Sequence, residues 1–261
     1  MDNGITGDLI VTDGVEEVTR FKEIIEDDSI KKIVVCISGG TDSPLILYFM
    51  AKFISISKSY DKEIYPHFIL DTGNVIQEKQ KLIPKQIDIV RELFPDVTIH
   101  DLFVQEIFRA EDWDDNAERY VGHNSEKYMD KLEKNMLNTI QPDLLLTGST
   151  RNLPTSLLKL YGHEVDIFGN IINAGKQLDA DEVPQLKRDR SPWYNVNKKF
   201  IAHQYKKEGL MKNLYPITES CICESMGEVY ETGGTDYPCK ICHQCIEKYI
   251  AFGMYDRCVT K

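Results

Sequence analysis

The chain has 261 residues, 42% of them hydrophobic, which is enough to bury a core within one large domain or one domain with a small appendage. A formal net charge of -11 argues against broad electrostatic attraction to nucleic acid as the basis of binding. The sequence contains no apolar run of about 18 residues, and it begins without the basic and then apolar pattern of a secretory signal. We therefore expect a cytoplasmic protein that does not associate with membranes.

In chain order, the first expected element is an amphipathic helix within an N-terminal extension at residues 1–30. Its apolar residues recur at helical spacing: Val15, Val18, Phe21, Ile24 and Ile25. Residues 33–37 then form a short apolar run rich in β-branched residues, which is typical of a strand buried on both faces. A glycine-rich loop follows this strand, and residues 43–58 show the apolar spacing of a helix.

The same alternation continues along the chain and predicts a parallel α/β sheet. Further strands are expected at 65–70, 97–104 and 144–147, and further helices at 75–94 and 200–210. Strands that alternate with helices pair in parallel, and ligands bind beyond the carboxyl ends of such strands. Residues 106–140 are expected to be mostly helical, and a hairpin is expected within 161–172.

The loop at residues 38–43, Ser-Gly-Gly-Thr-Asp-Ser, has the properties of an anion-binding site. Glycines let backbone N–H groups approach phosphate oxygens, and the N-terminus of the next helix adds partial positive charge. The hydroxyls of Ser38, Thr41 and Ser43 can donate further hydrogen bonds. Asp42 would repel a bare phosphate, so we expect it to cap the helix or to hold Mg²⁺. An ordinary strand–turn–helix corner is the alternative interpretation.

Ser-Gly-Gly-x-Asp-Ser after a strand resembles the loop of the PP-loop ATP pyrophosphatases. Those enzymes cleave ATP between its α and β phosphates, adenylate a substrate and let a nucleophile displace AMP. The resemblance implies a HUP-type, PP-loop parallel sheet flanked by helices across residues 31–215. It also assigns the binding of ATP and its pyrophosphate to the loop residues Ser38, Gly39, Gly40, Thr41, Asp42 and Ser43.

Two other expected strand ends carry residues that suit a nucleotide site. Asp71-Thr72-Gly73 resembles a corner that lies near the adenosine in PAPS reductases, which belong to the same superfamily; a hydrogen-bonded turn is the alternative. Gly148 would permit the close approach of a nucleotide. Arg151 is expected to pair with the α-phosphate or with a substrate carboxylate, and a surface arginine is the alternative.

Three of the seven cysteines, Cys239, Cys242 and Cys245, lie within seven residues of one another. An odd number of cysteines in a chain without a secretory signal argues against a disulfide framework. Zinc prefers four thiolates in closed structural sites, so Cys221 or Cys223 is expected to complete the set. A redox-active Cys-x-x-Cys pair is the alternative interpretation.

A narrower resemblance covers the C-terminal residues. Thr-x-Ser-Cys followed by Pro-Cys-x-x-Cys-x-x-Cys is similar to the ending of the 7-cyano-7-deazaguanine synthases. The resemblance implies a zinc-binding appendage at 216–261 with a structural Zn²⁺ ion. Its four ligands would be Cys221, Cys239, Cys242 and Cys245.

The same family has a proline–lysine spacing that Pro192 and Lys198 repeat. There the lysine faces the nucleotide phosphates, so Lys198 is expected to do the same. Lys198 lies in a stretch, 185–212, that contains eight Lys or Arg residues and two acids. This basic stretch is interpreted either as a cationic wall beside phosphates or as a solvated helix face.

Together these resemblances imply an ATP-dependent ligase that forms C–N bonds and uses ATP, Mg²⁺ and Zn²⁺. The implied substrates are 7-carboxy-7-deazaguanine, whose carboxylate is adenylated, and ammonia, and the product is the amide or nitrile of queuosine biosynthesis. Enzymes of this kind are often homodimers. The expected catalytic residues are Asp42, Ser43, Lys198 and Arg151.

Other functions stay open. A sulfurtransferase or PAPS-reductase-like enzyme needs an exposed reactive cysteine outside the zinc set, and Cys36 is expected to be buried in its strand, which leaves Cys223 and Cys258. An adenylating enzyme that modifies a macromolecule, a protein or a nucleic acid, could dock it on the basic stretch and on residues 106–140. A non-catalytic ATP-binding protein is the last alternative.

Overall fold

The computed structural model describes residues 15–71, 77–107, 113–114, 119–120, 135–136, 138–150, 191–194, 196–221, 238, 240, 242–258 and 260. The elements in chain order are α1 (Val15–Glu26), β1 (Lys32–Cys36), α2 (Asp42–Ser57), β2 (Glu63–Asp71), α3 (Gln77–Leu93), β3 (Thr98–Ile99), β4 (Phe103–Ile107), β5 (Trp113–Asp114), β6 (Arg119–Tyr120), β7 (Leu144–Leu146), α7 (Lys198–Lys207), the short 3₁₀ helix η2 (Tyr215–Ile217), α8 (His243–Phe252) and the 3₁₀ helix η4 (Asp256–Cys258).

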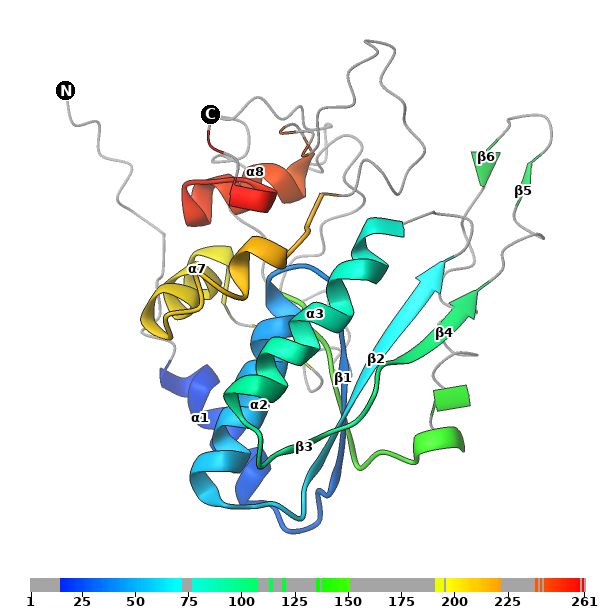
Figure 1. Ribbon diagram of the computed structural model, residues 1–261, viewed down its shortest axis with the longest axis vertical. Helices are drawn as coiled ribbons and strands as arrows, with labels where there is room; N and C mark the ends of the chain where they lie inside the picture. The colour runs from blue at the N-terminus through cyan, green and yellow to red at the C-terminus, as the bar shows by residue number, and fades with distance from the viewer. Residues whose placement is uncertain are drawn as a thin grey trace.

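A five-stranded sheet forms the centre of the molecule (Figure 1). The strands run in the order β3-β2-β1-β7, with β4 also paired to β2, and every pairing is parallel. In this register Val34 on β1 lies between Tyr65 on β2 and Leu145 on β7. The predicted parallel α/β sheet is confirmed, and the elements β1, α2, β2, α3 and β7 begin and end within two residues of their predicted bounds.

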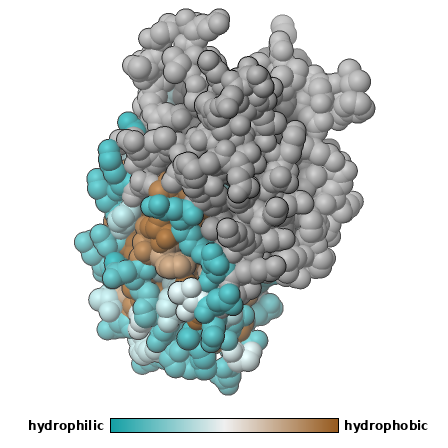
Figure 2. Space-filling model, turned by 90° about the vertical axis from the view of Figure 1, so that its right-hand side faces the viewer, coloured by the Kyte–Doolittle hydropathy of each residue, from teal (hydrophilic) through white to brown (hydrophobic). Residues whose placement is uncertain are grey.

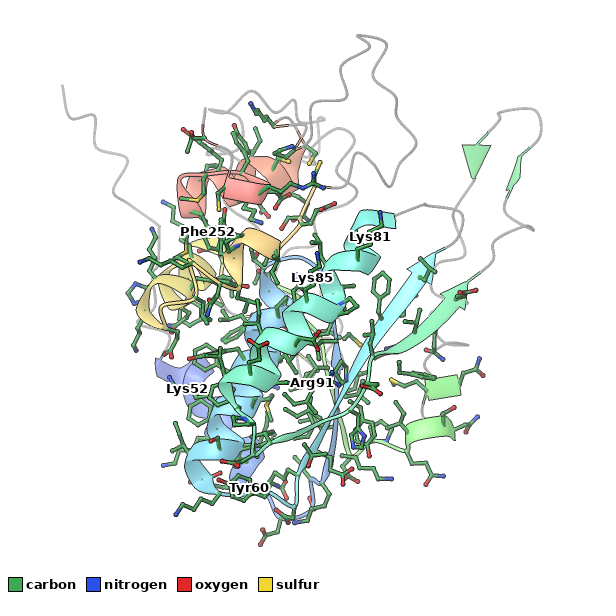
Figure 3. All side chains as sticks on the ribbon, in the orientation of Figure 1. Lys52, Tyr60, Lys81, Lys85, Arg91 and Phe252 are labelled. Carbon is green, nitrogen blue, oxygen red and sulfur yellow. The ribbon has the colours of Figure 1, made fainter. Side chains whose placement is uncertain are left out.

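The predicted third strand, 97–104, is divided into two. β3 and β4 pair with successive parts of β2, and Arg91 on α3 holds the point of division (Figure 3). Its guanidinium donates hydrogen bonds to the carbonyl oxygens of Ile99 (3.1 Å) and His100 (2.8 Å), which a continuous strand would offer to a neighbouring strand. A strand pattern in the sequence could not reveal this competing donor.

The expectation of a mostly helical segment at 106–140 is wrong for its first part. β4 continues to Ile107, and β5 and β6 form a separate antiparallel pair in which Trp113 lies opposite Tyr120. Aromatic residues favour strands, which accounts for the departure. Helical residues at 135–136 and 138–140 occur in the last part of this segment. The hairpin expected within 161–172 lies outside the described residues.

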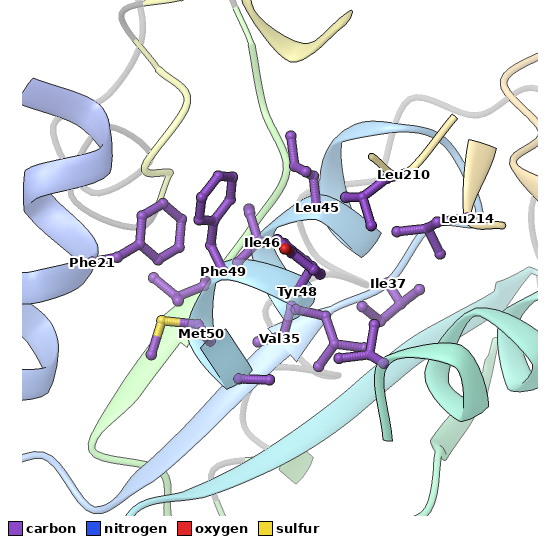
Figure 4. Packing of buried hydrophobic residues seen from close by; sticks show 14 of the residues in the cluster. Phe21, Val35, Ile37, Leu45, Ile46, Tyr48, Phe49, Met50, Leu210 and Leu214 are labelled. Atoms are coloured by element: carbon purple, nitrogen blue, oxygen red, sulfur yellow. The ribbon is translucent and has the colours of Figure 1, made fainter. Parts of the chain in front are cut away.

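α2 lies against the sheet at the centre of the main hydrophobic core (Figure 4). Ten of its residues are buried because α1, α3 and α7 pack around it as well as β1. Phe21 of α1 is fully buried there, with its ring 5.6 Å from that of Phe49 and 5.0 Å from that of Trp193. α8 joins the same core through Phe252, whose ring lies 4.5 Å from Tyr215 (Figure 3).

A second, smaller cluster covers the opposite face of the sheet. Val34 packs there against Met136 and Ile140. Figure 2 shows the side of the molecule on which β4 lies; the part of this surface that belongs to described residues is mostly hydrophilic and contains an apolar area. No helix among the described residues is both long and apolar enough to cross a membrane.

Candidate functional site

A pocket of about 400 Å³ opens beside the loop that joins β1 to α2. Its walls come from five places: this loop, the end of β7, the first residue of α7, the segment before Cys221, and α8. The size falls within the range of small-molecule sites. The described residues that line it are Ser38, Gly40, Thr41, Asp42, Gly148, Ser149, Thr150, Lys198, Glu219, Ser220, Gln244 and Glu247.

The loop is held in shape by its own side chains and by distant ones. The Ser38 N–H donates to Ser43 Oγ at 2.9 Å, and the two hydroxyl oxygens lie 3.2 Å apart. Gly39 has a φ of 81°, which glycine adopts without strain. Its carbonyl oxygen accepts from the Gln86 side chain (3.0 Å) and from the Glu219 N–H (2.8 Å). Ser43 is 1% exposed and is not among the lining residues, so in this structure it shapes the loop.

Asp42 and Lys198 form an ion pair in the wall of the pocket. Asp42 Oδ2 lies 2.5 Å from Lys198 Nζ, and Lys198 is only 4% exposed. Thr41, not Asp42, occupies the N-cap position of α2, and it makes no side-chain cap hydrogen bond. One of the two roles expected of Asp42 was to cap the helix, and the structure shows that it does not. Asp42 lies instead in the first turn of α2, where the helix dipole favours a negative charge.

Two aromatic side chains fix the backbone at the start of α2. Tyr205 donates its hydroxyl hydrogen to the backbone carbonyl oxygen of Thr41 at 2.9 Å. The ring N–H of Trp193 donates to the backbone carbonyl oxygen of Asp42 at 3.1 Å. Burial, together with the negative charge of Asp42, raises the pKa of Tyr205 well above its ordinary value. The phenol therefore stays protonated and remains a donor. Sequence reasoning missed both residues, because nothing in their spacing indicates contact with a loop some 150 positions away.

Gly148, two residues after the end of β7, lies directly against the start of α2. A Cβ atom built on it would come within 2.8 Å of the Ser43 backbone nitrogen. Glycine is therefore required by the protein's own packing, in addition to any approach of a nucleotide.

We expect Gly148→Ala to reduce the free energy of unfolding by about 1–3 kcal/mol, because backbone atoms of Ser43 must shift to admit the methyl group. Denaturant unfolding measures the change. Gly40→Ala is the matched control, since a Cβ there would have no neighbour closer than 3.5 Å. Equal stability of the two variants would contradict this interpretation.

The segment immediately before Cys221 closes the other side of the pocket. Glu219 and Ser220 both line it, and both are more than nine-tenths buried. Glu219 pairs with Arg257 at 3.3 Å. Sequence reasoning did not select these two residues, although their position next to a predicted zinc ligand was a signal that could have found them.

Three of the four predicted metal ligands are brought together. The sulfur atoms of Cys221, Cys242 and Cys245 all lie within 4.8 Å of one another. Zinc–sulfur bonds of about 2.3 Å in a tetrahedron place sulfur atoms roughly 3.8 Å apart, so the thiols fit a thiolate-bound metal such as Zn²⁺. Of the two candidates for the upstream ligand, Cys221 lies in the cluster. Cys223, the other candidate, and Cys239, the fourth predicted ligand, lie outside the described residues.

A buried ion pair ties this cysteine cluster to the pocket wall. Asp256 Oδ2 accepts hydrogen bonds from the backbone N–H groups of Ser220 and Cys221, both at 2.9 Å. Its other carboxylate oxygen pairs with Lys248, which also donates to Thr218 Oγ1 at 2.8 Å. Both charged side chains are completely buried.

The remaining predicted site residues are less fully described. Asp71 ends β2, and its backbone pairs with Ile107. Thr72 and Arg151 lie outside the described residues. Within the described part of the basic stretch, Lys198 lines the pocket, whereas the other four lysines are not buried: Lys199, Lys206, Lys207 and Lys212. The interpretation as a solvated helix face therefore holds for these four lysines, and the interpretation as a cationic wall beside phosphates stays a prediction for Lys198.

Cys36 is not fully buried in its strand, contrary to expectation. It is the last residue of β1 and is partly exposed, because its side chain lies on the less covered face of the sheet. Its sulfur lies 3.6 Å from His67 Nδ1, and His67 Nε2 lies 2.6 Å from the amide oxygen of Gln105. That oxygen accepts the Nε2 hydrogen, which leaves Nδ1 as an acceptor facing the thiol. Burial lowers the pKa of His67, so the ring is neutral.

Comparisons with known proteins add little to this geometry. No protein-family model and no curated protein matches the chain. Among solved structures it is similar to the U34-tRNA thiolase NcsA from Methanococcus maripaludis, solved with its 4Fe-4S cluster, at 13% identity over 91% of this chain and 76% of that chain, with a TM-score of 0.45. It is also similar to NMN synthetase from Francisella tularensis, at 12% identity over 90% of this chain and 85% of that chain, with a TM-score of 0.44.

Proposed function

We propose that this protein is an ATP-dependent enzyme that cleaves ATP between its α and β phosphates and adenylates a carboxylate. The observation that carries the proposal is the convergence on one pocket of the glycine-rich loop, the N-terminus of α2 and the Asp42–Lys198 pair. Backbone N–H groups, a helix N-terminus and a buried lysine are the groups that bind polyphosphates.

The roles of the pocket residues follow from charge. A polyphosphate in the pocket would bring negative charge beside Lys198, which would turn from Asp42 to the phosphate oxygens. Asp42 is then available to hold Mg²⁺, whose ordinary ligands are carboxylate and phosphate oxygens. Magnesium supplies charge neutralisation on the departing pyrophosphate. The chain itself mainly positions the reactants and neutralises charge, so no covalent enzyme intermediate is required.

The proposed reaction is that of a C–N ligase resembling the 7-cyano-7-deazaguanine synthases. The carboxylate oxygen of 7-carboxy-7-deazaguanine attacks the α-phosphorus, and pyrophosphate leaves. Ammonia then attacks the acyl carbon and AMP leaves, giving the amide. The nitrile requires a second ATP, whose α-phosphorus is attacked by the amide oxygen with release of pyrophosphate; loss of AMP and of the nitrogen-bound protons then gives the nitrile. The Thr-x-Ser-Cys pattern and the cysteine cluster that follows it support this acceptor.

The zinc site is proposed to be structural. Cys221, Cys242 and Cys245 would hold the ion with Cys239, and the metal would fix the N-terminus of α8 against the segment that ends at Cys221. Two of these thiols are almost completely buried, which suits a closed site.

The test is the release of pyrophosphate and AMP from ATP and Mg²⁺, with and without 7-carboxy-7-deazaguanine and ammonium. The proposal expects release that depends on the acid, and its loss in Asp42→Asn. If pyrophosphate is released only when a protein, a nucleic acid or a sulfur carrier is added, the proposed cleavage of ATP is supported and the proposed acceptor is wrong. The products ADP and phosphate would rule out adenylation.

A sulfur-transfer enzyme is the second candidate, and Cys36 favours it. The Nδ1 atom of the neutral imidazole can accept the hydrogen of the thiol, and it could act as general base when the thiol attacks a sulfur donor. Such a cysteine could carry sulfur, a role for which the sequence offered only Cys223 and Cys258.

We expect His67→Leu to lower the rate of Cys36 alkylation by iodoacetamide at neutral pH by at least about tenfold, because the proton acceptor is removed. Peptide mass spectrometry separates Cys36 from the exposed Cys258, which serves as an internal control. An unchanged Cys36 rate in the variant would reduce the pair to a packing contact. If Cys36→Ser keeps full pyrophosphate release with the deazaguanine acid, sulfur transfer through Cys36 is excluded.

A further inference from the structure

The hydroxyl of Ser220 is buried in the pocket wall without a hydrogen-bond partner. Ser220 is 8% exposed, and its Oγ atom is sealed from solvent. Among the described residues, two other buried side-chain oxygens share this condition, those of Gln86 and Gln204, and neither residue lines the pocket. A buried hydroxyl left unpaired destabilises the folded protein, and folded proteins keep few such groups.

The position of Ser220 is fixed from both sides. Its own N–H and that of Cys221 donate to Asp256, which the buried Lys248 holds in place. The preceding residue, Glu219, donates its N–H to the Gly39 carbonyl oxygen of the loop. The backbone around Ser220 is therefore held in place beside the loop.

The hydroxyl lies against the glycine-rich loop. A Cβ atom built on Gly40 would lie 3.6 Å from Ser220 Oγ and 3.5 Å from Ser38 Oγ. The space next to the Gly40 backbone is thus bordered by two serine hydroxyls, one from each wall of the pocket. An oxygen atom that accepts hydrogen bonds from this loop would come within reach of both.

Given the proposed ATP site, on which this step rests, we infer that Ser220 is a phosphate-binding residue. When the side chain rotates about its Cα–Cβ bond toward the pocket that the residue lines, the hydroxyl donates a hydrogen bond to a non-bridging oxygen of the pyrophosphate part of ATP, opposite the loop. The binding of that anion satisfies the hydroxyl that the protein alone leaves unpaired. The residue also joins the metal centre to the nucleotide, because Cys221, the next residue, belongs to the cysteine cluster.

The test compares metal-loaded wild type with Ser220→Ala by calorimetric titration with inorganic pyrophosphate and Mg²⁺. We expect the Kd to rise by about tenfold or more, as for a lost hydrogen bond to a charged group. The Tm without ligand is expected to stay the same or to rise, because an unsatisfied buried group is removed. Metal content should not change. Ser57→Ala, in the last turn of α2 with its hydroxyl bonded to Phe53, is the control for a serine far from the loop.

The outcomes separate this inference from the proposed function. Equal Kd values for wild type and Ser220→Ala would overturn the role of Ser220 and leave the ATP site standing. Weaker binding accompanied by a lower Tm or by loss of metal would assign Ser220 a structural role and overturn the inference as well. Wild-type protein that does not bind pyrophosphate would overturn both.

Discussion

Lys248→Met is expected to reduce the free energy of unfolding by about 3–5 kcal/mol, because it leaves the Asp256 carboxylate buried without its cation. Both side chains are completely inaccessible, and burial lowers the pKa of Lys248, so the environment tolerates the charges only as a pair. The Lys248 Nζ atom also lies 4.7 Å from the centre of the Tyr215 ring and donates to Thr218. Denaturant unfolding of metal-loaded protein measures the loss.

Lys52→Met is the matched control. Lys52 forms an equally direct ion pair with Glu208, but these two side chains are 27% and 11% exposed, whereas Lys248 and Asp256 are completely buried. Glu208 also keeps a hydrogen bond from Tyr48, at 2.8 Å. We expect this substitution to change stability by no more than about 1 kcal/mol. If the two variants lose the same stability, the buried pair does not have the structural importance assigned to it here.

Lys198→Ala is expected to slow pyrophosphate release from ATP by about 10²–10³-fold, because in the proposed reaction this buried, pocket-lining cation faces the charge on the departing group. The fold should survive, since the helix dipole favours the charge of Asp42 after its partner is removed. The rate is measured with the deazaguanine acid and ammonium present in excess.

Lys199→Ala provides the comparison, because Lys199 is the next residue on α7 but does not line the pocket. We expect its rate to stay close to that of wild type, and the melting temperature of both variants to stay within a few degrees. A similar rate for the two variants would show that Lys198 takes no part in the reaction.

The strand–loop–helix unit that begins the site could be predicted from the sequence. The run 33–37 is apolar throughout, and the helix after it begins one residue from its expected start. Polar residues at the carboxyl end of a parallel strand were expected to face a ligand, and most of residues 38–43 border the pocket. Both signals are local, so they need no knowledge of the tertiary structure.

The other wall of the pocket could not be predicted in this way. Ser220 and Glu219 meet the loop across about 180 positions of chain, through contacts that the fold alone creates. The Lys248–Asp256 pair looks in the sequence like two ordinary surface charges, because neither burial nor pairing leaves a local pattern. Gly148 was selected for a nucleotide, and its contact with Ser43 emerged only from the packing of β7 against α2.

The exposure of Cys36 also could not be predicted from the sequence. An apolar, β-branched run predicted burial for the whole strand, and three of its residues, Ile33, Val34 and Val35, are indeed inaccessible. Cys36, however, is the last residue of β1 and lies on the less covered face of the sheet, so its exposure depends on which residues cover that end of the strand. The spacing of apolar residues in the sequence does not indicate which residues will cover the end of the strand.

The most direct test of the central claim is the binding of a non-hydrolysable ATP analogue, α,β-methylene-ATP, to the metal-loaded protein with Mg²⁺, measured by calorimetric titration. It does not depend on the identity of the acceptor. The account predicts one site per chain in the wild type, and loss of binding in Gly40→Ala, whose added Cβ fills space between the loop and Ser220 while the fold is kept. Absence of binding by the wild type, or equal binding by Gly40→Ala, would contradict the account.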